Sequence, residues 1–281
     1  MPDLGFGEIG EKLRRSTVQV RRGRSGCGSG VIWSADGLVI TNAHVTRDGR
    51  GLTVELWDGS RRTAQLESVD MRRDLAALRI GATDLSPATI GDSDVLRVGE
   101  LAIAVGNPFG FAGALSTGVI HAVGPVHGLG SRTWVQADVR LAPGNSGGPL
   151  ADARGRVIGL NTMVAGGIGL AIPSNAAGRF VRVGPSAYTL GVTVRPVALG
   201  RGKESALLVL AVTPGSAAHS ASILVGDLLL AANEKRLRDA DDLSDALDRA
   251  SGGIVHLQFS RGDRTLTRRV TVQLHTRSAA A

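Results

Sequence analysis

The sequence predicts a mainly β fold, with two β-barrels in tandem followed by a small α+β domain. Three observations support this prediction. Short strand-like runs recur at regular spacing with Gly, Pro and Asp-Gly turns between them, which is typical of barrels and sandwiches. They fall into two series, at about residues 16–95 and 96–172, so we expect two similar barrels with a cleft between them. After residue 184 the pattern changes, and strands are interrupted by an amphipathic helix.

The first series follows a short helical lead at residues 7–15. Its first run alternates apolar and polar residues with the two-residue period of a strand. Two later runs flank Asp36-Gly37, which predicts a hairpin. The expected strands are residues 17–21, 30–33, 38–41, 53–57, 63–69 and 75–80.

The second series and the C-terminal domain are predicted in the same way. A helix at residues 174–183 is expected to close the second barrel, with Ser174 and Asn175 as its cap. The second series comprises residues 100–106, 118–123, 133–137, 157–161 and 170–172. In the last domain, at residues 185–275, we expect strands at 188–194, 206–212, 228–231, 254–260 and 265–274, a helix at 239–250, and a frayed tail at 276–281.

Composition excludes several classes of protein. With 281 residues, 43% of them hydrophobic and 20% charged, the chain is globular rather than disordered. We expect no membrane span, because no apolar run approaches the roughly 18 residues that one requires. The first residues contain no basic region followed by an apolar one, so we expect no secretory signal, and the compartment stays open. The single cysteine, Cys27, excludes an intramolecular disulfide.

The chain has a net charge of +7, and nearly all of its basic residues are arginine. Scattered arginine pairs could indicate nucleic-acid binding. Aromatic residues make up only 3% of the chain and no basic stretch is interleaved with them, so bases would find little to stack on. We therefore expect a solvated, arginine-rich surface and no nucleic-acid partner.

The first candidate for chemistry is Ser146, in the stretch Leu141-Ala142-Pro143-Gly144-Asn145-Ser146-Gly147-Gly148-Pro149-Leu150. Its glycines permit positive φ and close backbone approach, while its prolines remove donors. Such a loop can direct consecutive N–H groups into one small space, as an oxyanion hole requires. A plain tight turn is the alternative on this stretch alone.

A nucleophilic serine needs a base, and the base needs an orienting acid. Among the six histidines, only His44 closes a strand of the first series. Asp74 opens an apolar strand, where a buried carboxylate needs a hydrogen-bond donor. Asp70, in more polar surroundings, is the competing acid.

The order His, Asp, Ser on two β series is that of the chymotrypsin-like serine proteases. More specifically, the chain resembles the HtrA (DegP/DegS-like) family. The matching segments are Thr41-Asn42-Ala43-His44-Val45, Arg73-Asp74-Leu75-Ala76, Gly106-Asn107-Pro108-Phe109-Gly110, Gly144-Asn145-Ser146-Gly147-Gly148-Pro149 and Gly169-Leu170-Ala171-Ile172-Pro173-Ser174. The C-terminal domain resembles that family's PDZ domain, through Leu190-Gly191-Val192, Pro214-Gly215-Ser216-Ala217, Gly226-Asp227-Leu228-Leu229 and Asp242-Leu243.

The resemblance implies a serine endopeptidase that cleaves unfolded or damaged proteins. Residues 1–183 would form the protease domain and 185–275 the PDZ domain. His44 would be the general base, Asp74 would orient it and Ser146 would attack the carbonyl. Gly144, Asn145 and Ser146 would form the oxyanion hole. The resemblance implies no metal or organic cofactor.

The family pattern also implies, by position, which residues contact the substrate. Leu141, Val164, Ile168 and Leu170 are expected near the pocket for the residue before the cleaved bond, and Leu170 could equally pack the barrel. Leu190, Gly191 and Val192 would bind a peptide C-terminus that adds as a strand.

The resemblance also implies a homotrimer and unfolded or misfolded polypeptides as partners. The alternative function is a non-proteolytic, chaperone-like peptide binder. Two departures from the family pattern bear on activation, namely short loops at 124–132 and 164–169. A further departure, in the PDZ domain, is Glu234 in place of a glycine.

Overall fold

The computed structural model describes residues 5–23, 27–47, 49–126, 129, 132–184, 188–199, 205–238 and 240–276. Residues 185 and 186 of the predicted domain boundary at 184–186, the tail after residue 276 and part of the 124–132 loop lie outside these residues. The chain divides into two compact units, the first comprising Met1–Gly124 and Thr133–Pro185, the second Pro125–Arg132 and Ser186–Ala281.

The first barrel follows helix α1 (Phe6–Arg15). It is a closed antiparallel barrel in the order β1-β2-β3-β6-β5-β4. Its strands are β1 (Thr17–Arg22), β2 (Cys27–Ile32), β3 (Leu38–Thr41), β4 (Leu52–Glu55), β5 (Arg61–Asp70) and β6 (Leu75–Ile80). Buried aliphatic side chains, among them Val18, Val39, Leu52 and Leu78, fill its interior. Burial of this apolar surface is the main favourable term in its stability.

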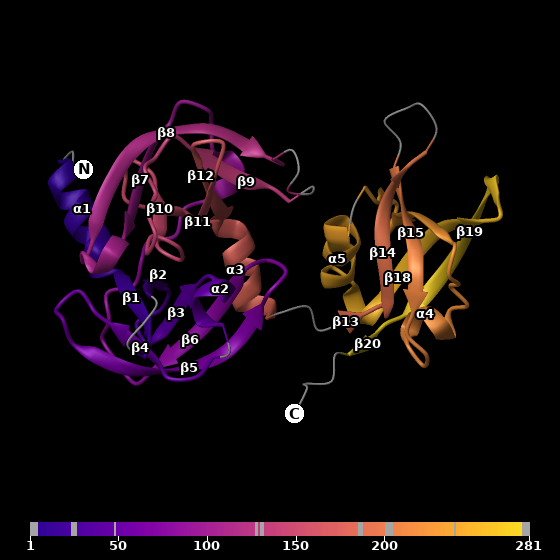
Figure 1. Cartoon of the computed structure of the whole chain (residues 1–281), viewed down its shortest axis with the longest axis horizontal. Coiled ribbons are helices and arrows are strands. Elements are labelled where there is room, and N and C mark those ends of the chain that lie inside the picture. Colours follow the sequence, from indigo (N-terminus) through magenta and orange to yellow (C-terminus); the bar gives the residue numbers. More distant parts are fainter. Residues whose placement is uncertain are drawn as a thin grey trace. The chain divides into compact units, whose positions relative to one another are not determined.

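The second barrel has the same closed form, in the order β10-β11-β12-β9-β8-β7. Its strands are β7 (Leu101–Gly106), β8 (Ala114–Gly124), β9 (Trp134–Ala137), β10 (Pro149–Ala151), β11 (Val157–Ala165) and β12 (Ile168–Pro173). Short 3-10 turns lie at Ser93–Val95 (η1) and Pro108–Gly110 (η2), and helix α3 (Ser174–Val183) follows the barrel. Figure 1 shows both barrels, the first in indigo and violet, the second in magenta and rose.

The second unit contains a five-strand path in the order β14-β15-β16-β18-β19, with β17 paired to β16. Its elements are β13 (Tyr188–Thr189), β14 (Val192–Ala198), β15 (Ser205–Val212), α4 (Ala217–Ser220), β16 (Leu228–Ala232), β17 (Lys235–Arg236), α5 (Ala240–Asp248), η3 (Ser251–Gly253), β18 (Ile254–Arg261), β19 (Asp263–Gln273) and β20 (His275–Thr276). Leu243 and Leu247 of α5 pack into its core with Leu207, Val255 and Leu257. The predicted fold class, two barrels followed by an α+β unit, is therefore confirmed.

Four local expectations differ from the structure. His44 lies in a short helix, α2 (Ala43–Thr46), just after β3 rather than at its end. The strand predicted at 188–194 is two strands, because Gly191 has a φ of 79° and breaks the pairing. Strand β10 was not predicted, because it is only three residues long. The side chain of Ser174 bonds the Gly91 carbonyl instead of capping α3.

Among the described residues, no helix is long and apolar enough to span a membrane.

Candidate active site

His44 and Asp74 are brought together at one end of the first barrel. Asn42, between β3 and α2, donates from Nδ2 to the Asp74 carbonyl at 3.0 Å. His44 Nδ1 lies 2.9 Å from Asp74 Oδ2 and 3.0 Å from Oδ1, and its backbone N–H donates to Oδ1 at 3.0 Å. One ring nitrogen is thus fixed on the carboxylate, which leaves Nε2 on the opposite side of the ring.

Asp74 occupies an unusual backbone position. Its φ of 56° lies in the left-handed region, which is uncommon for residues other than glycine. Asp70, the competing acid, accepts instead from the backbone N–H groups of Arg72 and Arg73 and from the Arg73 guanidinium at 2.9 Å. Asp74 is therefore the carboxylate that pairs with His44.

Hydrogen bonds hold the Asp74 carboxyl in its charged form. Burial acts to raise the pKa of Asp74, because it penalises the charge. Donation from the His44 ring, the His44 N–H and the Thr162 hydroxyl outweighs this, and the pKa lies below its ordinary value. The carboxylate is consequently ionised at neutral pH and can stabilise a protonated imidazole.

Thr162 is a residue of the site that the sequence did not predict. Its hydroxyl, on β11 of the second barrel, donates to Asp74 Oδ2 at 2.7 Å. The Thr162 carbonyl accepts from Ser146 Oγ at 2.9 Å. One buried threonine therefore contacts both the acid and the serine, 88 and 16 residues away in sequence. No local pattern around Asn161-Thr162 signals this, since the contact depends on how the two barrels pack.

The loop that carries Ser146 adopts the glycine-dependent conformation expected from its sequence. Gly144 has a φ of 106° and Gly147 a φ of 84°. The Gly147 N–H donates to the Asn161 carbonyl at 2.7 Å, and this hydrogen bond links the loop to β11. Ser146 Oγ donates its hydrogen to the Thr162 carbonyl in this structure, so it must release this bond before it can donate to the imidazole of His44.

Two backbone N–H groups of this loop are available to an oxyanion. Within the described part of the chain, neither the Gly144 nor the Ser146 N–H donates a hydrogen bond to another residue. Asn145, the third expected donor, uses its N–H to bond the Ala142 carbonyl at 3.0 Å. The structure therefore removes Asn145 from the candidate oxyanion hole, because its donor is already satisfied.

A cavity of about 180 Å³ lies beside Ser146. Leu141 and Val164 line it, together with Thr162 and Met163, which the sequence did not predict. Leu170 does not line it and is 1% exposed, so it packs the second barrel. Ile168 is likewise absent from its lining. Of the four expected pocket residues, two are beside the serine in this structure.

Of the predicted peptide-binding residues of the second unit, Leu190 and Gly191 directly precede β14 and Val192 begins it. Leu190 is buried, and its carbonyl accepts from the Ala218 N–H at 2.8 Å. Gly191 packs against Ser216 so closely that a Cβ there would lie 2.2 Å from the Ser216 Cβ. Strand β14 pairs with β15 on one side and lies at the edge of the sheet. Among the described residues, no strand pairs with its other side.

The double barrel and the His44–Asp74 pair beside Ser146 define the class of trypsin-like peptidases. Residues 28–160 match the family described as trypsin-like peptidase domain, and residues 208–261 match the PDZ domain.

Two curated relatives match most of the chain. A probable periplasmic serine endoprotease DegP-like from Chlamydia trachomatis is 37% identical over 265 residues, which cover 87% of this chain and 53% of the relative. The serine protease HTRA1 of Xenopus tropicalis is 33% identical over 273 residues, covering 87% and 59%. The chain thus spans little more than half the length of these relatives.

A solved structure, the HtrA-type protease AlgW with decapeptide, superposes with a TM-score of 0.81 at 27% identity, over 99% of this chain and 100% of that one. The crystal structure of the serine endoprotease from Yersinia pestis superposes with a TM-score of 0.77 at 27% identity, over 98% and 99%. The chain belongs to the HtrA family of DegP-like serine proteases, with a trypsin-like domain followed by a PDZ domain.

Proposed function

We propose that the protein is a serine endopeptidase that cleaves unfolded or damaged polypeptides, with His44, Asp74 and Ser146 as its catalytic residues. The observation that carries this proposal is the pairing of His44 with an ionised Asp74 on one barrel, beside a serine loop on the other with two unused N–H groups. Residues 1–183 would form the protease domain and residues 185–275 the PDZ domain.

The reaction follows from these groups. Ser146 Oγ leaves the Thr162 carbonyl, donates its proton to His44 Nε2 and attacks the peptide carbonyl. Asp74 stabilises the imidazolium without taking the proton. The negative oxygen of the tetrahedral intermediate accepts from the N–H groups of Gly144 and Ser146. The imidazolium then protonates the leaving amine, and water hydrolyses the acyl-enzyme by the same route.

The cavity beside Ser146 supports a preference for a small or medium aliphatic residue before the cleaved bond. Leu141, Met163 and Val164 supply apolar surface, and no charged side chain lines the cavity among the described residues. A lysine or arginine side chain would lose its hydration there without gaining an ionic partner.

We propose that the second unit binds peptide C-termini. A peptide would add as a strand at the open edge of β14, and its carboxylate would accept from the N–H groups at Leu190, Gly191 and Val192. Two similar solved structures are described as AlgW with a decapeptide and with a tripeptide, which supports this proposal. The homotrimer stays a prediction, to be tested by light scattering coupled to size-exclusion chromatography.

Casein digestion by the wild type and by Ser146→Ala tests the proposed activity, with and without C-terminal peptides as activators. We expect cleavage by the wild type alone. Covalent labelling of Ser146 by a fluorophosphonate probe tests nucleophile, base and oxyanion hole together. Equal cleavage by both proteins, or none by either under every activating peptide, contradicts the proposal and favours a non-proteolytic peptide binder.

A further inference from the structure

Every peptide carbonyl from Pro143 to Ser146 is held by a hydrogen bond. We call this segment the nucleophile loop. The four donors, in chain order, are the Phe109 N–H at 3.2 Å, Ser29 Oγ at 2.7 Å, the Gly148 N–H at 3.0 Å and the Ser29 N–H at 2.7 Å. Ser29, on β2 of the first barrel, thus supplies two of the four.

Two of these bonds act directly on the peptide units that carry the oxyanion-hole donors, and the two bonds from Ser29 hold the neighbouring units. A peptide unit is planar and trans, so its N–H points away from its own carbonyl. The Gly144 N–H shares a peptide unit with the Pro143 carbonyl, and the Ser146 N–H shares one with the Asn145 carbonyl. The Pro143–Gly144 unit is held by the longest of the four bonds, and its donor belongs to the turn that follows Asn107.

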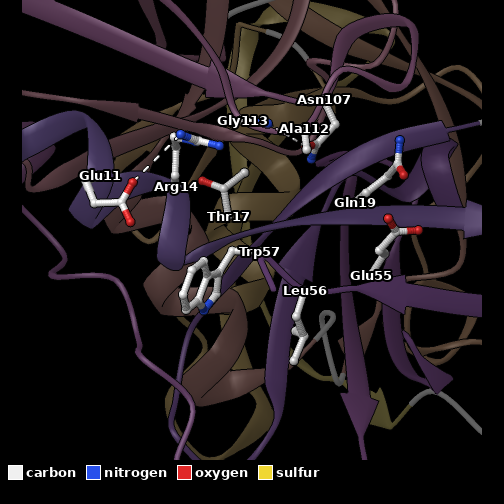
Figure 2. A pocket seen from close by; sticks show the side chains of 10 residues that line it. All are labelled: Glu11, Arg14, Thr17, Gln19, Glu55, Leu56, Trp57, Asn107, Ala112 and Gly113. Atoms are coloured by element: carbon white, nitrogen blue, oxygen red, sulfur yellow. Dashed lines mark hydrogen bonds and ion pairs between the residues drawn. The ribbon is translucent and has the colours of Figure 1, made fainter. Parts of the chain in front are cut away.

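Asn107 fixes the position of that turn. The side chain is 4% exposed, and its Nδ2 donates to the Val18 carbonyl at 2.9 Å. Its Oδ1 accepts from the Gly113 N–H, also at 2.9 Å. Figure 2 shows Asn107 beside Ala112 and Gly113, among the residues that line a small cavity. The turn is therefore anchored to β1 at one end and closed on itself at the other.

The hydroxyl of Ser29 is directed by Asn107. A hydroxyl offers one donor and two acceptor sites. Both acceptor sites of Ser29 Oγ are used, by the Asn107 N–H at 2.9 Å and by Asn107 Nδ2 at 3.2 Å. The single hydroxyl hydrogen is then left for the Gly144 carbonyl at 2.7 Å. Because Ser29 is fully buried, no water competes for this bond.

Packing keeps the two segments in register. A Cβ on Gly144 would lie 2.5 Å from the Asn107 carbonyl oxygen, and a Cβ on Gly106 would lie 2.9 Å from the Asn145 Cα. The turn and the nucleophile loop therefore touch along their backbones, and neither can shift without the other.

We propose that Ser29 and Asn107 are positioning residues for the oxyanion-hole N–H groups. Ser29 acts by holding the Gly144 and Ser146 carbonyls, which belong to the peptide units next to those that carry the two donors. Asn107 acts by holding the turn that fixes the Pro143 carbonyl. Neither touches substrate. The proposal rests on the proposed function, since it assigns a role within that site.

The test compares Ser29→Ala with Ser174→Ala. Ser174 is a matched control, because it is also buried and its hydroxyl also donates to a backbone carbonyl, that of Gly91, at 2.7 Å. We expect both variants to lower the melting temperature. Only Ser29→Ala should lower kcat, by about 10- to 100-fold, since outright loss of an oxyanion donor costs about 10²- to 10³-fold. KM should change less than about twofold, as expected when an interaction made only in the transition state is lost.

Asn107→Ser is the second variant, in case Ser29→Ala does not fold; it removes the bonds to Val18 and Gly113 and should lower kcat in the same way. Equal kcat for a folded Ser29 or Asn107 variant and for Ser174→Ala overturns the proposal. If the wild type itself neither cleaves casein nor reacts with a fluorophosphonate, the proposed function fails instead. In that case kcat cannot be compared, and a crystal structure of the folded Ser29 or Asn107 variant tests the positioning role. A changed orientation of the Pro143–Gly144 or Gly144–Asn145 peptide supports it, and an unchanged loop refutes it.

Discussion

Replacing Thr162 by valine isolates one hydrogen bond of the site. Valine keeps the shape of the side chain but removes the hydroxyl that donates to Asp74 Oδ2 at 2.7 Å. The carboxylate retains the His44 ring and the His44 N–H as donors. A hydrogen bond to a charged group contributes about 1.5–3 kcal/mol, so the free energy of unfolding at pH 7 should fall by an amount in this range.

The pH dependence of this loss has a definite sign. The pKa of Asp74 lies below its ordinary value in the folded state, so its carboxylate contributes stability above its unfolded pKa. That contribution is lost as the pH falls through the folded pKa. Thr162→Val raises the folded pKa of Asp74, and its destabilisation should shrink as the carboxylate becomes protonated.

Urea denaturation of the wild type and Thr162→Val at pH 7, 5 and 4 measures this effect, alongside kcat for a peptide substrate. Thr17→Val is the control, because Thr17 is also buried and its hydroxyl donates at 2.7 Å to a neutral acceptor, the Leu13 carbonyl. Its destabilisation should not depend on pH, and kcat should fall only in Thr162→Val, by about tenfold. Identical pH profiles for the two variants would refute the assignment of Thr162 as a donor that holds the ionised Asp74.

Three further outcomes are expected. Asp74→Asn should lower kcat by about 10⁴-fold, the loss seen when the aspartate of a chymotrypsin-like triad is replaced, while circular dichroism stays unchanged. Leu170→Ala should destabilise the protein by about 2–5 kcal/mol in urea without changing the preferred residue before the cleaved bond, because Leu170 packs the barrel and is absent from the cavity lining. Asp227→Ala should cost about 1.5–3 kcal/mol, the range for a hydrogen bond to a charged group, because it removes the fully buried carboxylate that accepts from the Arg261 guanidinium at 2.7 and 2.8 Å. The guanidinium is 30% exposed and keeps its bond to the Ser222 carbonyl, so no buried charge is left unpaired; calorimetry measures the loss.

Local patterns predicted the fold class well because strands and turns have local causes. Alternation indicated β1, and Asp36-Gly37 indicated the turn before β3. The patterns failed where an element is too short to show a period, as at β10, or where one residue breaks pairing, as Gly191 does. His44 was placed at the end of the strand that precedes it, because the four-residue helix that carries it is too short to show a helical period.

The sequence identified the site residues that lie in recognisable motifs and missed those whose role depends on long-range contacts. His44, Asp74 and Ser146 were identified through their sequence order and motif resemblance, and the structure brings the first two into contact. Thr162 was missed because its contact with Asp74 spans 88 residues and two barrels. The expected pocket residues were assigned by position alone, which cannot distinguish a side chain that faces the cavity from one on the other face of the same sheet. Leu170 illustrates this, since adjacent strand residues point to opposite faces.

At the site, each barrel donates hydrogen bonds to groups that the other barrel carries. Ser29 of the first barrel holds carbonyls of the loop that the second barrel carries, and Thr162 of the second barrel donates to the acid that the first barrel carries. Each of these side chains is buried, so each bond forms only when the barrels are packed together. A chain with one barrel displaced would lose the orientation of both Asp74 and the Gly144 carbonyl at once. Because neither barrel alone contains a complete set of the groups that the chemistry requires, we infer that the competence of the site depends on the packing of the two barrels.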